Sequence, residues 1–352
     1  MTLRSPALRS LAASPLAGWL ATVASVAVVL VVLMAVAGAP FGAAMAGFFE
    51  GAFGGRRFVY LMATLSRAML IVGMAVSAML SLRAGLFNVG GEGQLVAGGL
   101  VSALVALAVP GPPPVVLAAA VLAGMAAGAA WALLAGVLEA AAGVPLLVGS
   151  LLLNFPIRSL ASYAVAHPFR DVPSGMVQSP LVPAATWLPY FPGVRLDAGI
   201  VVVAVLVAAA VLYAGRTVHG YHTRLLGLAP EFARTAGLPV TALTLQTLAA
   251  SGAIAGLVGA LAVFGIHHRY VDGMLVQPLY AWTGIMAVLL AGAVPWLVPL
   301  SGLLFAALET GAVGMERATQ VPKEIAVVMQ AVIILAFAGR ATAGIRRATG
   351  DG

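Results

Sequence analysis

The stretch GLFNVGGEGQLVAGG, residues 85–99, sets Asn88, Glu92 and Gln94 among glycines between two long apolar runs. Glycine allows a helix to unwind or a neighbouring backbone to approach closely. If the flanking runs lie in a membrane, such irregular backbone must be buried in protein or line a cavity. A carboxylate at that depth is by default a functional-site hypothesis. Two interpretations follow. The polar groups line or support a solute path, or they form a turn in which Glu92 caps the next helix.

The composition of the whole chain supports the membrane environment. Of its 352 residues, 62% are hydrophobic and 8% are charged, and the mean hydropathy is +1.07. An ordinary soluble domain is about 25% charged. The apolar runs predict an all-α polytopic membrane protein with about ten transmembrane helices, some short or broken, in one bundle. These runs lie near residues 17–38, 60–82, 94–109, 115–138, 146–166, 198–214, 240–265, 281–294, 297–314 and 325–338.

The predicted organisation has a cytoplasmic N-terminus (1–15), a transmembrane domain (16–338) and a cytoplasmic tail (339–352). Residues 167–196 form a long proline-rich loop, and residues 215–240 are the most polar interior stretch. Arginines near both ends and in the 215–240 loop place these segments in the cytoplasm, which leaves the 167–196 loop outside. The first apolar run is longer than the roughly 7–15 residues of a signal-peptide core, which favours an uncleaved first span.

Several kinds of chemistry find no support in the sequence. The chain has no cysteine, and its single lysine, Lys323, follows no glycine-rich phosphate loop. His267 and His268 are adjacent, so their side chains diverge on a helix and predict no metal site. We therefore expect no catalytic residue, cofactor or metal in this chain. The net charge of +7 does not predict nucleic-acid binding, because the arginines are spread over many loops.

The stretch LLGLAPEFARTAGLP, residues 225–239, predicts a short helix at about residues 231–236. Pro230 and Glu231 suit the first turn of a helix, where proline lacks no hydrogen bond and an acid meets the positive end of the dipole. Gly237 and Pro239 end it. A capped helix that stands off the membrane is either a contact point for a partner or a solvated connector.

Other polar residues lie within the predicted spans, where they are either functional or interhelical hydrogen-bonding groups. Asn154 and Arg158 are four positions apart and share a helix face. Arg67 or Arg158 is expected to pair with Glu309 within the bundle. Four tryptophans are expected to be interface anchors, and two GxxxG pairs to allow close helix packing. These are Trp131, Trp187, Trp282 and Trp296, and Gly124/Gly128 and Gly252/Gly256.

Four motifs occur in a familiar order: LFNVGGEGQLVAGG, PLLVGSLLLNFP, LLGLAPEFARTAGLPV and the segment from WTGIMAVLLAG to VPKEIAVVMQAVIIL. Together they resemble the permease subunits of bacterial ABC importers of the ribose/branched-chain-amino-acid permease superfamily. The EGQ block resembles the nucleoside and simple-sugar branch. The similarity covers about residues 60–340.

The resemblance implies a subunit of the bacterial inner membrane that forms the path for nucleosides or simple sugars. It implies three partners: an ATP-binding subunit that holds ATP and Mg, a second related permease, and a substrate-binding lipoprotein. The implied path residues are Asn88, Glu92, Gln94 and Asn154. The implied coupling helix, seated on the ATPase, has Pro230, Glu231, Ala233, Arg234 and Gly237. Here Ala229 replaces the usual asparagine and Phe232 the usual small residue.

Other functions remain open. The same kind of permease would serve for ribose-like sugars or branched-chain amino acids. An ion-coupled secondary transporter would also use broken helices, with Glu92 and Glu309 as its only titratable relay. A membrane scaffold would carry no solute at all.

Overall fold

The computed structural model describes residues 28, 31–32, 40–319, 322–325 and 327–332. The predicted N-terminal segment, first span and C-terminal tail, and half of the last span, lie outside these residues, apart from isolated positions in the first span. Within them the chain is helical and has no strand, which confirms the all-α membrane class. Seven helical segments are long and apolar enough to cross a membrane, and two apolar helices are shorter.

Two compact units divide the chain, one of residues 65–303 and the other of residues 1–64 and 304–352. The larger unit takes α4 (Val59–Arg83) from residue 65 onward and the first residues of α13 (Val298–Thr319). Between them it contains α5 (Gly91–Ala108), α6 (Pro113–Ala142), α7 (Leu146–Ala166), α8 (Gly199–Arg216), α9 (Val218–Leu228), α10 (Pro230–Thr235), α11 (Val240–Leu261), the π-helical turn η4 (Ala262–His267) and α12 (Tyr280–Leu290).

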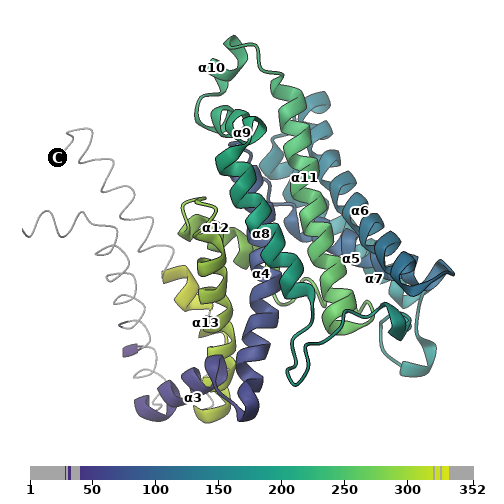
Figure 1. The fold of residues 1–352 in the computed structure, drawn as a ribbon, viewed down its shortest axis with the longest axis vertical. Coiled ribbons are helices and arrows are strands. Elements are labelled where there is room, and N and C mark those ends of the chain that lie inside the picture. Colours follow the sequence, from purple (N-terminus) through teal and green to yellow (C-terminus); the bar gives the residue numbers. More distant parts are fainter. Residues whose placement is uncertain (1–27, 29–30, 33–39, 320–321, 326, 333–352) are drawn as a thin grey trace, which may run out of the picture. The chain divides into compact units, whose positions relative to one another are not determined.

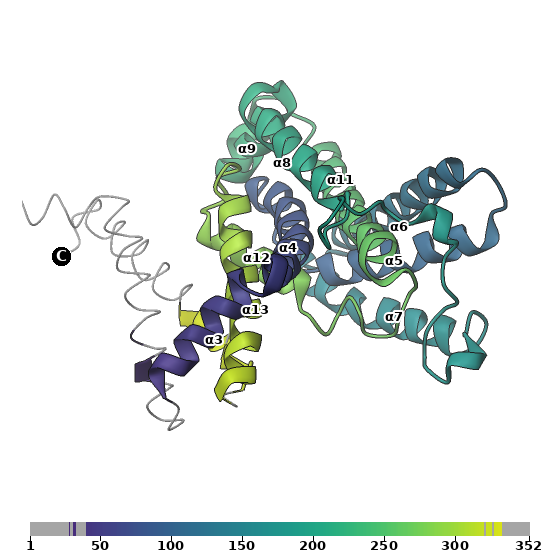
Figure 2. The ribbon, with the colours of Figure 1, turned by 60° about the horizontal axis from the view of Figure 1, so that its bottom comes forward.

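Glycines bring α5, α6 and α11 into close contact at the centre of the larger unit. The three helices lie side by side in Figure 1 and Figure 2. A Cβ on Gly128 or Gly256 would collide with backbone atoms of the facing helix. In a membrane, where lipid is as apolar as leucine, such small-residue faces allow the van der Waals contact that holds helices together. The close packing expected of both GxxxG pairs is confirmed.

The 167–196 loop is ordered against the segment that follows α11, with two 3-10 turns, η2 (Val172–Ser174) and η3 (Ala184–Thr186). The amide of Ser179 donates to the carbonyl of Tyr270 at 2.8 Å, and that of Leu188 donates to Phe264 at 3.0 Å. At the other end of α11 lie α9 and α10 (Figure 1). The short helix predicted at residues 231–236 is present at Pro230–Thr235.

The smaller unit contains α3 (Phe41–Phe53), the turn η1 (Arg56–Phe58), the start of α4 and most of α13. Gly47 and Gly51 of α3 pack directly against Gly314 of α13. The hydroxyl of Thr64 donates to the carbonyl of Ala52 at 2.7 Å. These contacts hold α3, α4 and α13 together by the same small-residue packing.

One predicted span differs. The apolar run at 281–294 forms only the eleven-residue α12, because the chain turns at Gly292 and Ala293, which have φ of +60° and +55°. About 20 residues are needed to cross the hydrocarbon core, so α12 is too short to span it.

Candidate functional site

The glycine-rich stretch forms a break between α4 and α5. The chain leaves α4 at Arg83, passes Gly85 with a φ of +74°, and resumes a helix at Gly91. The backbone at Gly85 approaches Gly227 of α9 so closely that a Cβ there would meet the Gly227 Cα at 3.0 Å. Irregular backbone is thus present where the sequence predicted it.

Side chains of the break itself and of α7 satisfy the backbone groups that the break exposes. The Asn88 Oδ1 accepts from the Gly90 amide at 2.9 Å and from the Gln94 Nε2 at 3.2 Å. The Asn154 Oδ1 accepts from the Gly93 amide at 2.8 Å, and its Nδ2 donates to the Val89 carbonyl at 3.2 Å. Asn88, Gln94 and Asn154 are brought together, all buried, and together they fix the geometry of the break.

Glu92 is also buried in the first turn of α5, where the Gly93 amide is capped by Asn154, and the recorded partners of the Glu92 carboxylate are side chains. One carboxylate oxygen accepts from the Trp282 Nε1 at 3.2 Å, and the other lies 3.3 Å from a guanidinium nitrogen of Arg158. The Glu92 side chain is 6% exposed and that of Arg158 is 44% exposed. The carboxylate is therefore held from α12 on one side and from the surface of α7 on the other.

Of the two arginines expected to pair with Glu309, Arg158 instead pairs with Glu92, and the pairing of Arg67 with Glu309 stays a prediction. Glu309 of α13 accepts a hydrogen bond from the Gln330 Nε2 at 3.2 Å, and Arg67 lies half-buried on α4. Trp282 was expected to be an interface anchor, and its bond to Glu92 was missed. No sequence signal could have found it, since 190 positions separate the two residues.

Two buried oxygens of this cluster retain hydrogen-bonding capacity. Among the described residues, the Gln94 Oε1 has no hydrogen-bond partner, and the Glu92 Oε1 has only the charge of Arg158 nearby. A buried acceptor without a donor costs about 1–3 kcal/mol. These oxygens are therefore suited to accept hydrogen bonds from a polar molecule that enters the cluster.

The second candidate site is α10, which lies beyond the end of α11 (Figure 1). Pro230 occupies its first turn, Glu231 follows, and Gly237 ends it with a φ of +79°. Ala233 is fully buried, whereas Glu231 and Arg234 are exposed and form an ion pair at 3.1 Å. The helix is thus anchored through one small residue and presents a charged, solvent-facing surface.

Phe232 adds a large exposed apolar side chain to α10, next to Leu228 at the end of α9. Phe232 therefore makes the exposed side of α10 partly apolar, beside the charges of Glu231 and Arg234. The departure from the small residue implied by the resemblance therefore falls on the solvent-facing side of this helix.

Residues 60–338 match the protein family described as the permease component of branched-chain amino acid transport systems. A glucose ABC transporter permease protein of Haloferax volcanii is 32% identical, over 77% of this chain and 74% of its own length. A guanosine ABC transporter permease protein of Bacillus subtilis is 28% identical, over 76% of each chain. A nucleoside ABC transporter permease protein of Lactococcus lactis is 26% identical, over 75% of each chain. One of these relatives is named for a sugar and two for nucleosides.

Proposed function

This chain belongs to the family of permease components of branched-chain amino acid transport systems, and we propose that it forms the membrane path of an ABC importer for nucleosides or related simple sugars. The observation that carries the proposal is the solvent-facing helix α10, set at the end of α11 within the region that matches the family. A separate ATPase subunit drives the transport. We expect ATP and Mg to bind that partner, and we expect no catalytic residue, cofactor or metal in this chain.

The proposed path passes the cluster of Asn88, Glu92, Gln94 and Asn154. The free acceptor oxygens of Gln94 and Glu92 support this proposal, because nucleosides and sugars are rich in hydroxyl donors. Asn88 and Asn154 contribute differently, since their hydrogen bonds hold the backbone of the break. They keep the acceptors in place.

The proposed lever is α10, with Pro230, Glu231, Ala233, Arg234 and Gly237. It seats in a groove of the ATPase, so closure of the ATPase on ATP moves α10 and, through α9 and α11, the helices around the break. Hydrolysis reverses the movement and reopens the path inward. The direct packing of α10 on α9 and α11 supports this mechanical connection.

Three further statements belong to the proposal. A second related permease completes the membrane unit as a heterodimer. A substrate-binding lipoprotein delivers cargo at the 167–196 loop. The protein lies in the bacterial inner membrane with both ends and α10 in the cytoplasm. The apolar spans support a multi-pass membrane protein.

There are two alternatives to nucleoside import by an ABC importer, one for the cargo and one for the energy source. A sugar cargo is favoured specifically by the 32% identity to the glucose permease protein. An ion-coupled transporter is less well supported, because Glu92, one of its two expected relay carboxylates, is engaged in an ion pair with Arg158.

Uptake measurements test this function. We expect labelled adenosine to enter cells that contain the chain in an energy-dependent manner, with competition by unlabelled nucleosides. Competition by ribose or glucose alone would assign the cargo to sugars, and competition by leucine would assign it to amino acids. Unchanged uptake in cells that lack the chain would contradict the proposal.

Variants of α10 test its proposed role in coupling to the ATPase. Glu231→Arg reverses the exposed charge of α10, and we expect it to lower ATP-dependent uptake at least about tenfold, the effect of losing roughly 1.4 kcal/mol of contact energy, with unchanged protein in the membrane. Deletion of residues 229–236 should abolish uptake. Thr235→Ala, exposed on the same helix, is the matched control and should transport normally. Normal uptake in the deletion would refute the coupling assignment.

A further inference from the structure

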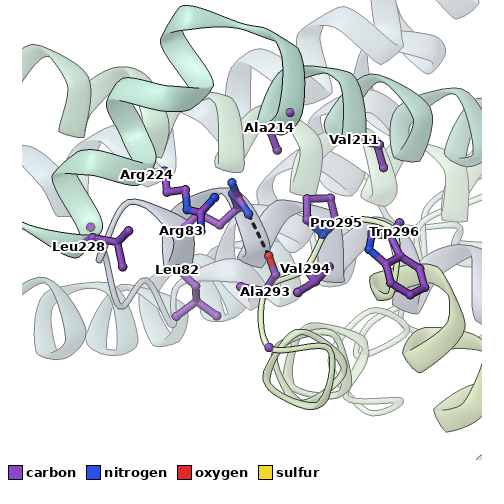
Figure 3. Close-up of a pocket in the computed structure, with 13 residues that line it drawn as sticks. Leu82, Arg83, Val211, Ala214, Arg224, Leu228, Ala293, Val294, Pro295 and Trp296 are labelled. Carbon is purple, nitrogen blue, oxygen red and sulfur yellow. Dashed lines mark hydrogen bonds between the residues drawn. The ribbon is translucent and has the colours of Figure 1, made fainter. Parts of the chain in front are cut away.

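A cavity of about 510 Å³ lies near α9, at the end of the larger unit that carries α10. It is an open cavity, lined by the C-terminal ends of α4 and α8, by α9, and by the turn at residues 292–296 (Figure 3). Its volume lies within the range of about 300–1,000 Å³ that is usual for small-molecule sites. The transport path proposed above uses none of the residues that line it.

Two arginines extend into this cavity from different helices. Figure 3 shows Arg83 of α4 and Arg224 of α9 on the same side of the space. Arg83 donates to the Ala293 carbonyl at 3.2 Å. Among the described residues, no carboxylate is recorded within ion-pair distance of either guanidinium. Two like charges that share one cavity repel each other until an anion lies between them. Guanidinium groups bind phosphate with paired hydrogen bonds, so a phosphate group fits this charge arrangement.

The rest of the cavity is apolar and adjoins the exposed apolar face of α8, which we infer to face lipid. Val211 and Ala214 of α8 line one wall, and Trp296 lines another. Only 17% of the α8 apolar window is buried, and its exposed residues Val201, Val205 and Leu212 share one helix face. Trp296 is largely exposed, and tryptophan is enriched at the level of lipid headgroups. A cationic cavity beside a lipid-facing helix fits a ligand with a phosphate head and an acyl tail.

We propose that this cavity binds the headgroup of an anionic phospholipid of the cytoplasmic leaflet. Arg83 and Arg224 contact the phosphate, and the acyl chains follow α8 and Trp296. Basic cavities between membrane helices on the cytoplasmic side recognise anionic headgroups in this way. The choice of leaflet rests on the proposed function, which places α9 and α10 in the cytoplasm. Because α9 leads through Ala229 directly into α10, the bound lipid also restrains the segment that carries the coupling helix.

Lipid binding to the purified full-length chain tests the proposal. The delipidated protein in neutral detergent is titrated with phosphatidylglycerol or with phosphatidylcholine, and bound lipid is counted by native mass spectrometry. We expect tighter binding of phosphatidylglycerol. Arg224→Gln should weaken it about fivefold, and the double variant with Arg83→Gln more than tenfold, since each basic residue contributes about a factor of five. Arg216→Gln is the matched control, because Arg216 is exposed at the end of α8 but does not line the cavity.

Four results would overturn the proposal. Two are equal binding of both lipids and an equal loss in Arg216→Gln. A third is full competition by inorganic phosphate at the lipid concentration, which would assign the site to a soluble anion. Displacement of phosphatidylglycerol by an added ATPase subunit would assign the cavity to the protein partner instead. Arg224→Gln alone keeps the test valid if the double variant does not fold, because Arg224 is exposed. The assay needs no transport, so its failure leaves the importer proposal intact, and a failed uptake assay leaves this one intact.

Discussion

At the scale of single residues, Glu92 determines much of the chemistry of the glycine-rich break. A buried carboxylate is stable only when it is paired and hydrogen-bonded. Arg158 supplies the charge and Trp282 the hydrogen bond, from two other helices. Removing one member of such a pair leaves the other uncompensated, whereas removing both is less harmful.

We therefore expect Arg158→Ala to lower the stability of the protein by about 1–3 kcal/mol, and the double variant Glu92→Ala/Arg158→Ala to be more stable than Arg158→Ala alone. Thermal unfolding of the purified variants measures this, with Ser159→Ala on the exposed face of α7 as the control. Glu92→Ala should reduce uptake more than the amount of protein. An equal loss of both would assign Glu92 a purely structural role.

His268 gives the 167–196 loop a dependence on pH. Its ring stacks on Trp187 with 3.9 Å between the ring centroids, and its backbone carbonyl accepts from the Val182 amide at 2.9 Å. Burial lowers the pKa of His268 from the usual 6.5, and this effect is partly offset by the nearby Phe264 backbone and by the charge of Asp197. A lowered histidine pKa stabilises the fold above pH 6.5 and loses that contribution as the pH falls through the folded-state pKa.

Amide hydrogen exchange at Val182 and Leu188 should therefore accelerate, relative to its intrinsic rate, as the pH falls below 6.5. His268→Asn should remove this dependence, because asparagine tolerates the left-handed backbone at this position, where φ is +55°. His219→Asn on exposed α9 is the control. Asp197 has the opposite effect on the pH dependence of stability. Burial raises the pKa of Asp197, so its contribution to the stability of the fold is lost as the pH rises through that raised value. Exchange that is flat with pH in the unmodified protein would contradict the role of His268.

At the scale of helices, the glycine faces of α5, α6 and α11 fix the bundle. A Cβ at position 256 would overlap the Gly124 carbonyl oxygen, which is backbone and cannot move aside without separating the helices. Gly256→Ala should cost at least about 1–3 kcal/mol, the usual penalty of overpacking, and Gly256→Val should abolish folding. A Cβ at Gly215 of α8 meets nothing within 4 Å, so Gly215→Ala should be neutral or slightly stabilising. Equal melting temperatures for the two alanine variants would contradict this packing.

The helices were largely predictable because a helix that crosses a lipid bilayer needs a long run of apolar residues. The run at 146–166 became α7 at Leu146–Ala166, and the capped segment became α10 within one residue. An apolar run does not indicate where a helix ends, however, so the end of α12 at Leu290, inside the apolar run 281–294, was not predicted. The partners of Glu92 were also missed, because α5, α7 and α12 meet only in the folded bundle. Sequence indicated which residues are polar and costly to bury, but not which of them face each other.

At the scale of the larger unit, different segments pack at the two ends of α11. It has 22 residues and is therefore about 33 Å long at about 1.5 Å per residue, enough to cross a hydrocarbon core of about 30 Å. The 167–196 loop packs beyond one end and α10 beyond the other (Figure 1). If α11 spans the membrane, the two segments face opposite compartments.

The chain has no cysteine, so one introduced thiol reports on one position. Thr235→Cys on α10 and Met176→Cys in the 167–196 loop both place the thiol on an exposed residue. In intact spheroplasts, a membrane-impermeant maleimide should label Met176→Cys only, and Thr235→Cys should react after lysis. The unmodified chain is the background control. The reverse pattern would show the opposite membrane orientation and would refute an ATPase contact at α10. Labelling of both variants from outside would show that α11 does not span the membrane.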